Sequence, residues 1–178
     1  MTWHIGPPDL VAGTRHSPTS GPDALRTLAR EFYAWRDSSS PVSSSDQGLH
    51  TWDNRLADYR MASVLAGRRH VSALLNRLKS MQVDSSNKDY WIDWLLFRSQ
   101  LEGSDFFARI MHSEESDPQI YVNECASGIF SLLKKEYAPH SVRALAAVSR
   151  LERVPGMLAI ARKNLTQPVR LFAQLAID

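Results

Sequence analysis

The short run at residues 50–55, HTWDNR, carries the most varied side-chain chemistry in the chain. It places an imidazole (His50), a carboxylate (Asp53) and a guanidinium (Arg55) in a stretch with neither helical nor strand periodicity. Because binding groups often lie on loops that a rigid scaffold holds, these residues are candidate substrate contacts. Alternatively, Asp53 and Arg55 tie the loop to neighbouring helices through charge-assisted hydrogen bonds. We favour this structural role.

A second cluster, HSEESD at residues 112–117, contains four side chains that could ligate a metal ion. Zinc sites on helices use ligands at i and i+4, and calcium loops have defined acidic positions with a turn glycine. This segment has neither pattern. We therefore expect a solvated acidic loop that binds no metal.

The sequence lacks other catalytic patterns. No histidine is followed by glutamate, so the zinc motif His-Glu-x-x-His is absent, and no serine lies in Gly-x-Ser-x-Gly. Glu124 and Glu136 lie ~18 Å apart along one expected helix, too far for a carboxylate pair. We expect Cys125, the single cysteine, to be a packed apolar residue. We assign no catalytic, metal-binding or cofactor-binding residue, and we expect no cofactor for this chain alone.

The composition is that of an ordinary globular domain, with 43% hydrophobic and 22% charged residues. The net charge of +2 arises from 21 basic and 19 acidic residues, so we expect no nucleic-acid partner. Apolar runs are far shorter than the ~20 residues that a membrane span needs, and the N-terminus lacks the pattern of a secretion signal. We therefore expect no membrane partner and a cytoplasmic location.

Apolar residues that recur every three or four positions predict an all-α fold, an irregular bundle of six to seven helices. The helix at about 88–103 is apolar around its girth, so we expect it to be central. We further expect its Trp94 and Leu101 to be buried against the helix at 118–135. An apolar stripe of Leu25, Leu28, Phe32 and Trp35 predicts a helix at about 22–37, and Pro118 and Pro139 bracket the helix at 118–135. The other expected helices cover about 59–80, 140–153, 157–165 and 168 to the C-terminus.

We expect residues 1–20 to form a disordered arm and 21–178 to form one helical domain, interrupted by a flexible Ser-rich linker at 37–47. The last helix still builds an apolar face where the sequence stops, which suggests an incomplete domain. We expect self-association or a protein partner through this face, whose members are Leu171, Phe172, Leu175 and Ile177.

Three segments, in their order and spacing, resemble the N-terminal half of the bacterial DUF885 family. Gly48–Asp58 is similar to the family's Gly-x-His-x-Tyr-Asp-x-Arg-Leu-x-Asp, with Trp52 in place of the usual tyrosine. Asp93–Glu102 resembles the helix that follows. Pro118–Pro139, followed by Arg150–Pro155, resembles the middle of that half.

Full-length DUF885 members resemble helical zinc-dependent peptidases that carry His-Glu-x-x-His. The resemblance implies that the zinc ligands and the general-base glutamate lie beyond residue 178, so zinc is expected only in full-length members. It also implies that these helices form one wall of a substrate cleft. We therefore expect a non-catalytic fragment or short homologue of a DUF885 peptidase-like protein. The alternative is a free-standing helical module that binds a partner through its apolar C-terminal surface.

Overall fold

The computed structural model describes residues 20–177, which form helices and no β-strand and confirm the predicted all-α fold. The predicted disordered arm lies outside these residues, except for Ser20. Six of the α-helices in this range are longer than ten residues. The elements are α1 (Pro22–Ser39), α2 (Pro41–Asp46), the 3₁₀ turn η1 (His50–Trp52), α3 (Met61–Lys79), α4 (Lys88–Phe106), the π-helical turn η2 (Phe107–Met111), α5 (Ser113–Ser116), α6 (Gln119–Lys134), α7 (His140–Leu151), α8 (Val154–Asn164) and α9 (Arg170–Leu175).

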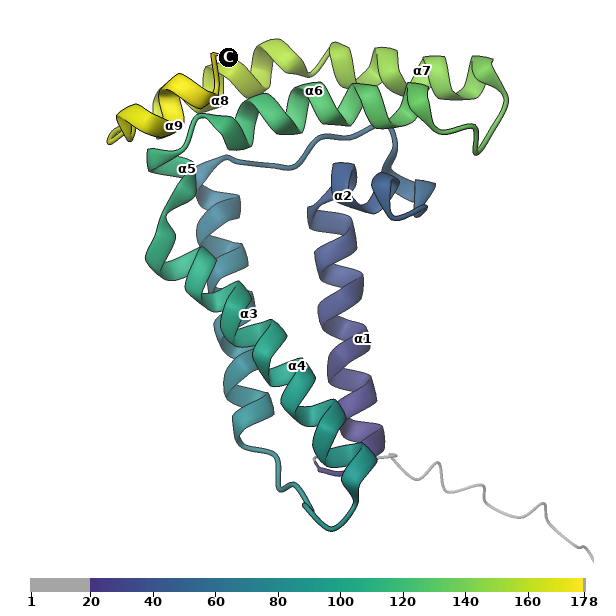
Figure 1. The fold of residues 1–178 in the computed structure, drawn as a ribbon, viewed down its shortest axis with the longest axis vertical. Helices are drawn as coiled ribbons and strands as arrows, with labels where there is room; N and C mark the ends of the chain where they lie inside the picture. The colour runs from purple at the N-terminus through teal and green to yellow at the C-terminus, as the bar shows by residue number, and fades with distance from the viewer. Residues whose placement is uncertain (1–19, 178) are drawn as a thin grey trace, which may run out of the picture.

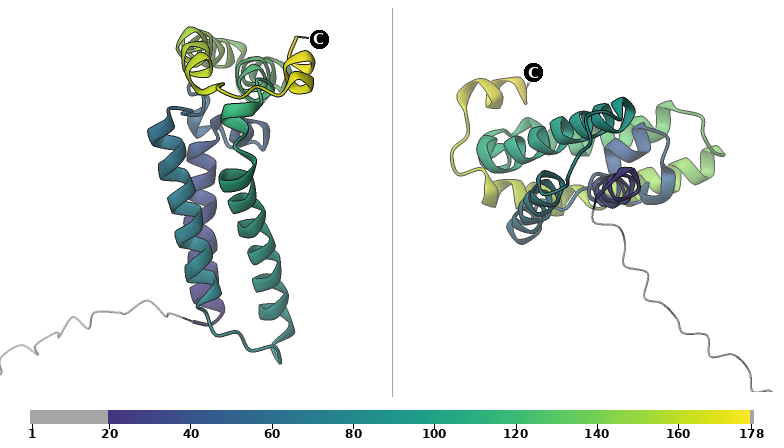
Figure 2. Two further views of the ribbon diagram at one scale, coloured as in Figure 1. Left: turned by 90° about the vertical axis from the view of Figure 1, so that its left-hand side faces the viewer. Right: turned by 90° about the horizontal axis from the view of Figure 1, so that it is seen from below.

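The helices form two layers that cross (Figures 1 and 2). Helices α1, α3 and α4 stand side by side and are called the stem. Helices α6, α7 and α8 lie across one end of the stem and are called the crossbar. Between the two layers lie α2, η1 and the irregular residues 53–60, which return the chain to α3. The connections between the layers therefore pass beneath the crossbar.

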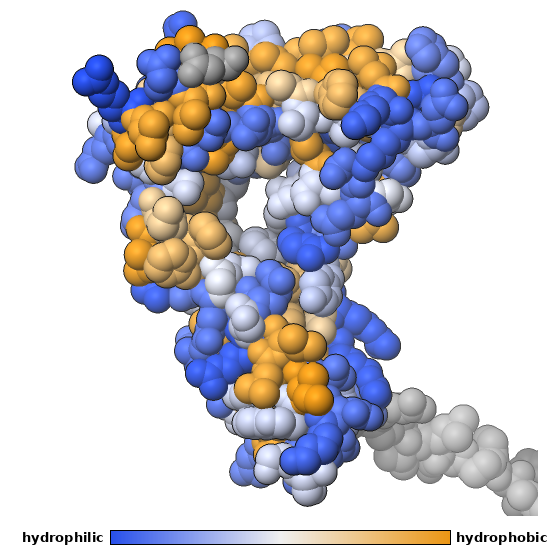
Figure 3. Space-filling view, in the orientation of Figure 1, coloured by the Kyte–Doolittle hydropathy of each residue, from blue (hydrophilic) through white to orange (hydrophobic). Residues whose placement is uncertain are grey.

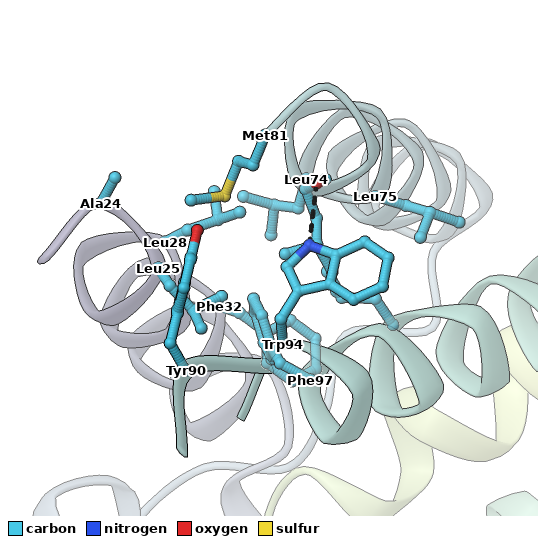
Figure 4. Packing of buried hydrophobic residues seen from close by; sticks show 12 residues of the cluster. Ala24, Leu25, Leu28, Phe32, Leu74, Leu75, Met81, Tyr90, Trp94 and Phe97 are labelled. Atoms are coloured by element: carbon cyan, nitrogen blue, oxygen red, sulfur yellow. Dashed lines mark hydrogen bonds between the residues drawn. The ribbon is translucent and has the colours of Figure 1, made fainter. Parts of the chain in front are cut away.

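The stem has its own hydrophobic core, formed by the inward side of each of its helices (Figure 4). The predicted apolar stripe of α1 is confirmed, since Leu25, Leu28 and Phe32 are buried. On α4, the Trp94 indole N–H donates to the carbonyl of Leu78 at 3.3 Å, so burial leaves this donor satisfied. The buried members of this core are Ala24, Leu25, Leu28, Phe32, Leu74, Leu75, Leu78, Met81, Tyr90, Trp94, Phe97 and Leu101.

The predicted position of α4 is wrong in one respect. Trp94 and Leu101 are buried, as expected. Their core, however, consists of residues from α1, α3 and α4 and of Met81, which follows α3, and it contains no residue of α6. The opposite side of α4 is not covered by another helix in the described part of the chain, and Leu96 there is 66% exposed. Apolar residues all around a helix therefore did not indicate a central helix, because one side of α4 has no covering element among residues 20–177.

The crossbar is built on the antiparallel pair of α6 and α7, with α8 packed beside α6 (Figure 2). Its smaller core contains the predicted packed thiol Cys125 together with Tyr121, Met157 and Ala161. Gly128 marks where α6 approaches α2 most closely, since a Cβ at this position would lie 2.9 Å from Cγ2 of Val42. A glycine there allows α6 of the crossbar to pack directly against α2.

The Ser-rich segment 37–47, predicted to be a flexible linker, is instead helical. Helix α1 continues through Ser39, and α2 begins at Pro41, which suits the first turn of a helix because it has no N–H to leave unpaired. Ser44 and Ser45 are buried, and the Ser44 hydroxyl donates to the carbonyl of Asp37 at 2.7 Å. Local composition predicted a linker because it could not show that these hydroxyls have buried partners.

The C-terminal segment is held mainly through its backbone. The N–H groups of Gln167 and Val169 donate to carbonyls of Glu115 and Ser116, at 3.1 and 2.9 Å. Short α9 therefore lies beside α5 and the start of α6 (Figure 1). Three of the four predicted apolar residues here are exposed, and the fourth, Phe172, is partly buried. Within the described residues, no helix is both long and apolar enough to span a membrane.

Candidate functional site

The structure separates the three residues that the sequence grouped as one candidate site. Gly48, with φ +89°, makes the turn that follows α2 and leads into η1. Asp53 then lies buried beneath the crossbar, with His50 partly buried beside it. Arg55 is exposed, takes no part in this contact, and lines a hollow between the stem and the crossbar. His50 and Asp53 therefore form one site, and Arg55 belongs to another.

Asp53 is the acceptor at the centre of a buried polar network. Its Oδ1 accepts from the Ser45 hydroxyl at 2.6 Å, and its Oδ2 accepts from the Tyr137 hydroxyl and lies 3.0 Å from His50 Nδ1. The rings of His50 and Tyr137 stack with centroids 3.4 Å apart and planes 3° from parallel. Burial, together with the hydrogen bond to Asp53, raises the pKa of Tyr137 to about 12. Both carboxylate oxygens are thus engaged within the fold.

Arg150 completes this network and was not found by reading the sequence. Its side chain is fully buried, and it donates to the carbonyl of Gly128 and, at 2.6 Å, to the hydroxyl of Ser45. Burial lowers the pKa of Arg150, and the nearby carboxylate of Asp53 opposes that shift. The network joins α2, η1, α6 and α7. This arrangement fits the structural alternative for Asp53, a charge-assisted tie of the loop to neighbouring helices.

Glu124 is a partly buried carboxylate that spacing arguments did not reveal. It accepts a hydrogen bond from the backbone N–H of Ala57 at 2.6 Å, which fixes the connecting segment 53–60 against α6. Burial raises the pKa of Glu124, and the bond from Ala57 partly opposes the shift. Burial likewise raises the pKa of the neighbouring thiol of Cys125. Because burial disfavours the thiolate form of Cys125, this shift agrees with the predicted packing role of the residue.

The predicted solvated acidic loop at 112–117 is also partly buried. Its residues form the short helix α5, and Glu114 is buried in an ion pair with Arg68. Ligand atoms of His112, Glu114 and Glu115 lie within 4.8 Å of one another, which is the spacing of a metal site. However, Arg68 Nη2 lies 2.9 Å from His112 Nδ1, so a guanidinium already occupies the place of a cation. The arrangement is therefore that of a buried ion-pair cluster.

A hollow with a volume of about 1470 Å³ lies between the stem and the crossbar (Figure 3). Its floor consists of α1, α3 and α4, and the connecting segment 53–60 forms its roof. The lining combines basic, apolar and small polar side chains. Its charged and apolar members include Trp35, Arg36, Arg55, Asp58, Arg60, Arg68, Leu96, Phe107, Glu114 and Arg153, and Gly103 also borders it.

Comparison with known proteins shows the fold and no more. The sequence matches no protein-family model and no curated protein. Among solved structures, a candidate lipoprotein of unknown function from Shewanella oneidensis is similar, with a TM-score of 0.74 and 24% identity over 86% of this chain. This chain spans 28% of the length of that structure. The helical arrangement described here therefore occurs within a much longer chain.

Proposed function

We propose that this chain is a non-catalytic helical part, or a short homologue, of a DUF885 peptidase-like protein, and that it forms one wall of a ligand cleft. The observation that carries the proposal is the fold match, which includes most of this chain but little more than a quarter of a longer helical protein. The hollow beneath the crossbar supplies a cleft of suitable size. The sequence resemblance supplies the family.

The proposal assigns no catalytic chemistry to the described residues. Among them, His112, Glu114 and Glu115 come nearest to a metal site, and Arg68 forms an ion pair with Glu114 there. Asp53 and His50 form an oriented pair, but every oxygen of the carboxylate also serves the buried network. We expect the zinc ligands to be supplied by sequence other than that of this chain.

Two measurements test the proposal. The genomic DNA downstream of codon 178 should contain a reading frame that encodes His-Glu-x-x-His. The protein that joins this frame to the present chain should bind zinc and hydrolyse peptides, whereas residues 1–178 alone should do neither. One tightly held zinc ion per isolated chain, measured by metal analysis, would contradict the proposal. So would a downstream sequence without any such frame.

A second candidate function is favoured by the exposed C-terminal surface. Leu171 and Ile177 are 63% and 80% exposed, and Leu175 is about half exposed. Burying each such side chain contributes about 1.5–3 kcal/mol, so a partner that covers these residues would form a complex stabilised by that burial. A free-standing interaction module would self-associate or bind a protein partner through these residues.

Light scattering over a range of protein concentrations tests this alternative. A dimer that dissociates on dilution, and that Leu175→Glu with Ile177→Glu abolishes, would support it. The matched control is Leu96→Glu, which changes an exposed leucine on the stem. A monomer at every concentration would count against self-association.

A further inference from the structure

We propose that the hollow between the stem and the crossbar binds an anionic group attached to an apolar body, and that Arg55 and Arg153 hold the anion. The inference rests on the proposed cleft role and deepens it by naming the ligand class. It depends on three observations: unbalanced charge in the lining, the position of the two arginines, and the apolar surfaces opposite them.

The lining of the hollow carries more positive charge than its carboxylates neutralise. Five arginines line it, against two carboxylates, those of Asp58 and Glu114. Three of the arginines have carboxylate partners, in the pairs Arg60–Asp58, Arg68–Glu114 and Arg36–Asp37. Within residues 20–177, the guanidiniums of Arg55 and Arg153 pair with no carboxylate. Two cationic groups are thus available to a ligand.

The fold brings these two arginines to the same hollow. Arg153 Nε donates to the backbone carbonyl of Asn54 at 3.0 Å. This bond fixes the Arg153 guanidinium beside the backbone segment that carries Arg55, although Arg153 belongs to the crossbar and Arg55 to the connecting segment 53–60. Its terminal nitrogens remain available as donors. A pair of guanidiniums at one edge of a cavity suits the planar geometry of carboxylate and phosphate oxygens.

The rest of the lining favours an apolar body over a free inorganic ion. Trp35 on α1, Leu96 on α4 and the 63% exposed Phe107 contribute apolar surface. Gly103 in the α4 wall has no neighbour within 4 Å of the position that a Cβ would take, so this part of the wall is open. The volume of about 1470 Å³ exceeds that of most small-molecule sites, and a short peptide with a free carboxylate would fit.

The binding experiment uses isothermal titration calorimetry of the full chain with three probes that share a naphthalene ring and differ in its polar group. Naphthoate carries a carboxylate, naphthyl phosphate carries a phosphate, and naphthamide is neutral. We expect at least one anion to bind at least about tenfold more tightly than naphthamide, and more weakly as salt rises. Tighter binding of naphthoate than of naphthyl phosphate indicates a carboxylate ligand, and the reverse order indicates a phosphate ligand.

Variants assign the binding to the hollow. The double substitution Arg55→Gln with Arg153→Gln should weaken binding of the anion about tenfold or more, whereas Arg162→Gln, exposed on α8 and outside the hollow, should leave it unchanged. Gly103→Leu should block binding by filling the open wall while circular dichroism shows an intact helical fold.

Failure to bind either anion, equal affinity for naphthamide, or unchanged affinity in the arginine double variant would overturn the inference. None of these results depends on what lies downstream of codon 178, so they remain distinct from a failure of the proposed function.

Discussion

Arg150 and Ser45 are 105 residues apart in the sequence, yet the Arg150 guanidinium donates to the Ser45 hydroxyl at 2.6 Å in the buried polar network beneath the crossbar. The same hydroxyl donates to Asp53, so one serine connects a buried cation to a buried anion. This relay joins α7 of the crossbar to α2 and η1.

Removing the buried cation should destabilise the fold strongly. Arg150→Met leaves Asp53 without its opposing charge and removes the side-chain donor to the Gly128 carbonyl. We expect a loss of about 3–5 kcal/mol in the free energy of unfolding, measured by urea denaturation. Arg162→Met, at an exposed position, should stay within about 0.5 kcal/mol of the wild type. If both variants unfold at the wild-type urea concentration, the network contributes nothing to stability.

The stem core can be tested with a pair of leucines on α4. Leu101 is fully buried, and Leu96 is 66% exposed. Leu101→Ala should therefore cost about 2–5 kcal/mol, because it removes buried surface and leaves a cavity. Leu96→Ala should change stability by less than about 0.5 kcal/mol. Thermal and urea unfolding measure both, and equal effects would contradict the orientation of α4.

The contact between α6 and α2 can be tested with a pair of glycines. A Cβ at position 128 would lie 2.9 Å from Val42 Cγ2 and 3.2 Å from Leu56 Cδ2, and neither neighbour has a long flexible end. We expect Gly128→Ala to destabilise the protein by about 1–3 kcal/mol. Gly103→Ala, which meets nothing within 4 Å in mid-helix α4, should stabilise it by about 0.5–1 kcal/mol. Effects of the same sign would show that the close approach is absent.

The partly buried carboxylate of Glu124 should make stability depend on pH. Burial raises its pKa, so the folded state holds this proton more tightly than the unfolded state does. The ionised group therefore destabilises the fold above its folded pKa, and this penalty disappears as the pH falls through that value. Glu124→Gln cannot ionise, and its amide oxygen can still accept from the Ala57 N–H.

We expect Glu124→Gln to be more stable than the wild type near neutral pH, with a difference that shrinks as the solution is acidified. Urea midpoints across the pH range measure this. Glu136→Gln, which removes an exposed carboxylate near the end of α6, is the matched control. A Glu124→Gln variant that is less stable than the wild type at neutral pH would instead show that its charge supports the fold.

The sequence by itself determined the long helices, because their formation depends on local periodicity and on residues near helix ends. The stripe Leu25, Leu28 and Phe32 predicted α1, and Pro118 and Pro139 bracketed α6. The packed state of Cys125 also followed from its apolar neighbours on one helix. Each of these predictions needed only a few residues of context.

Only the tertiary structure decided which helices meet and which charges are buried. Trp94 and Leu101 were correctly expected to be buried, but periodicity gives the face of a helix and not the identity of its partner. Ser45 and Arg150 resemble ordinary surface residues when each is considered alone. Their burial depends on partners about a hundred positions away, and the hollow with Arg55 and Arg153 exists only because two layers cross. Such long-range pairings leave no local pattern in the sequence.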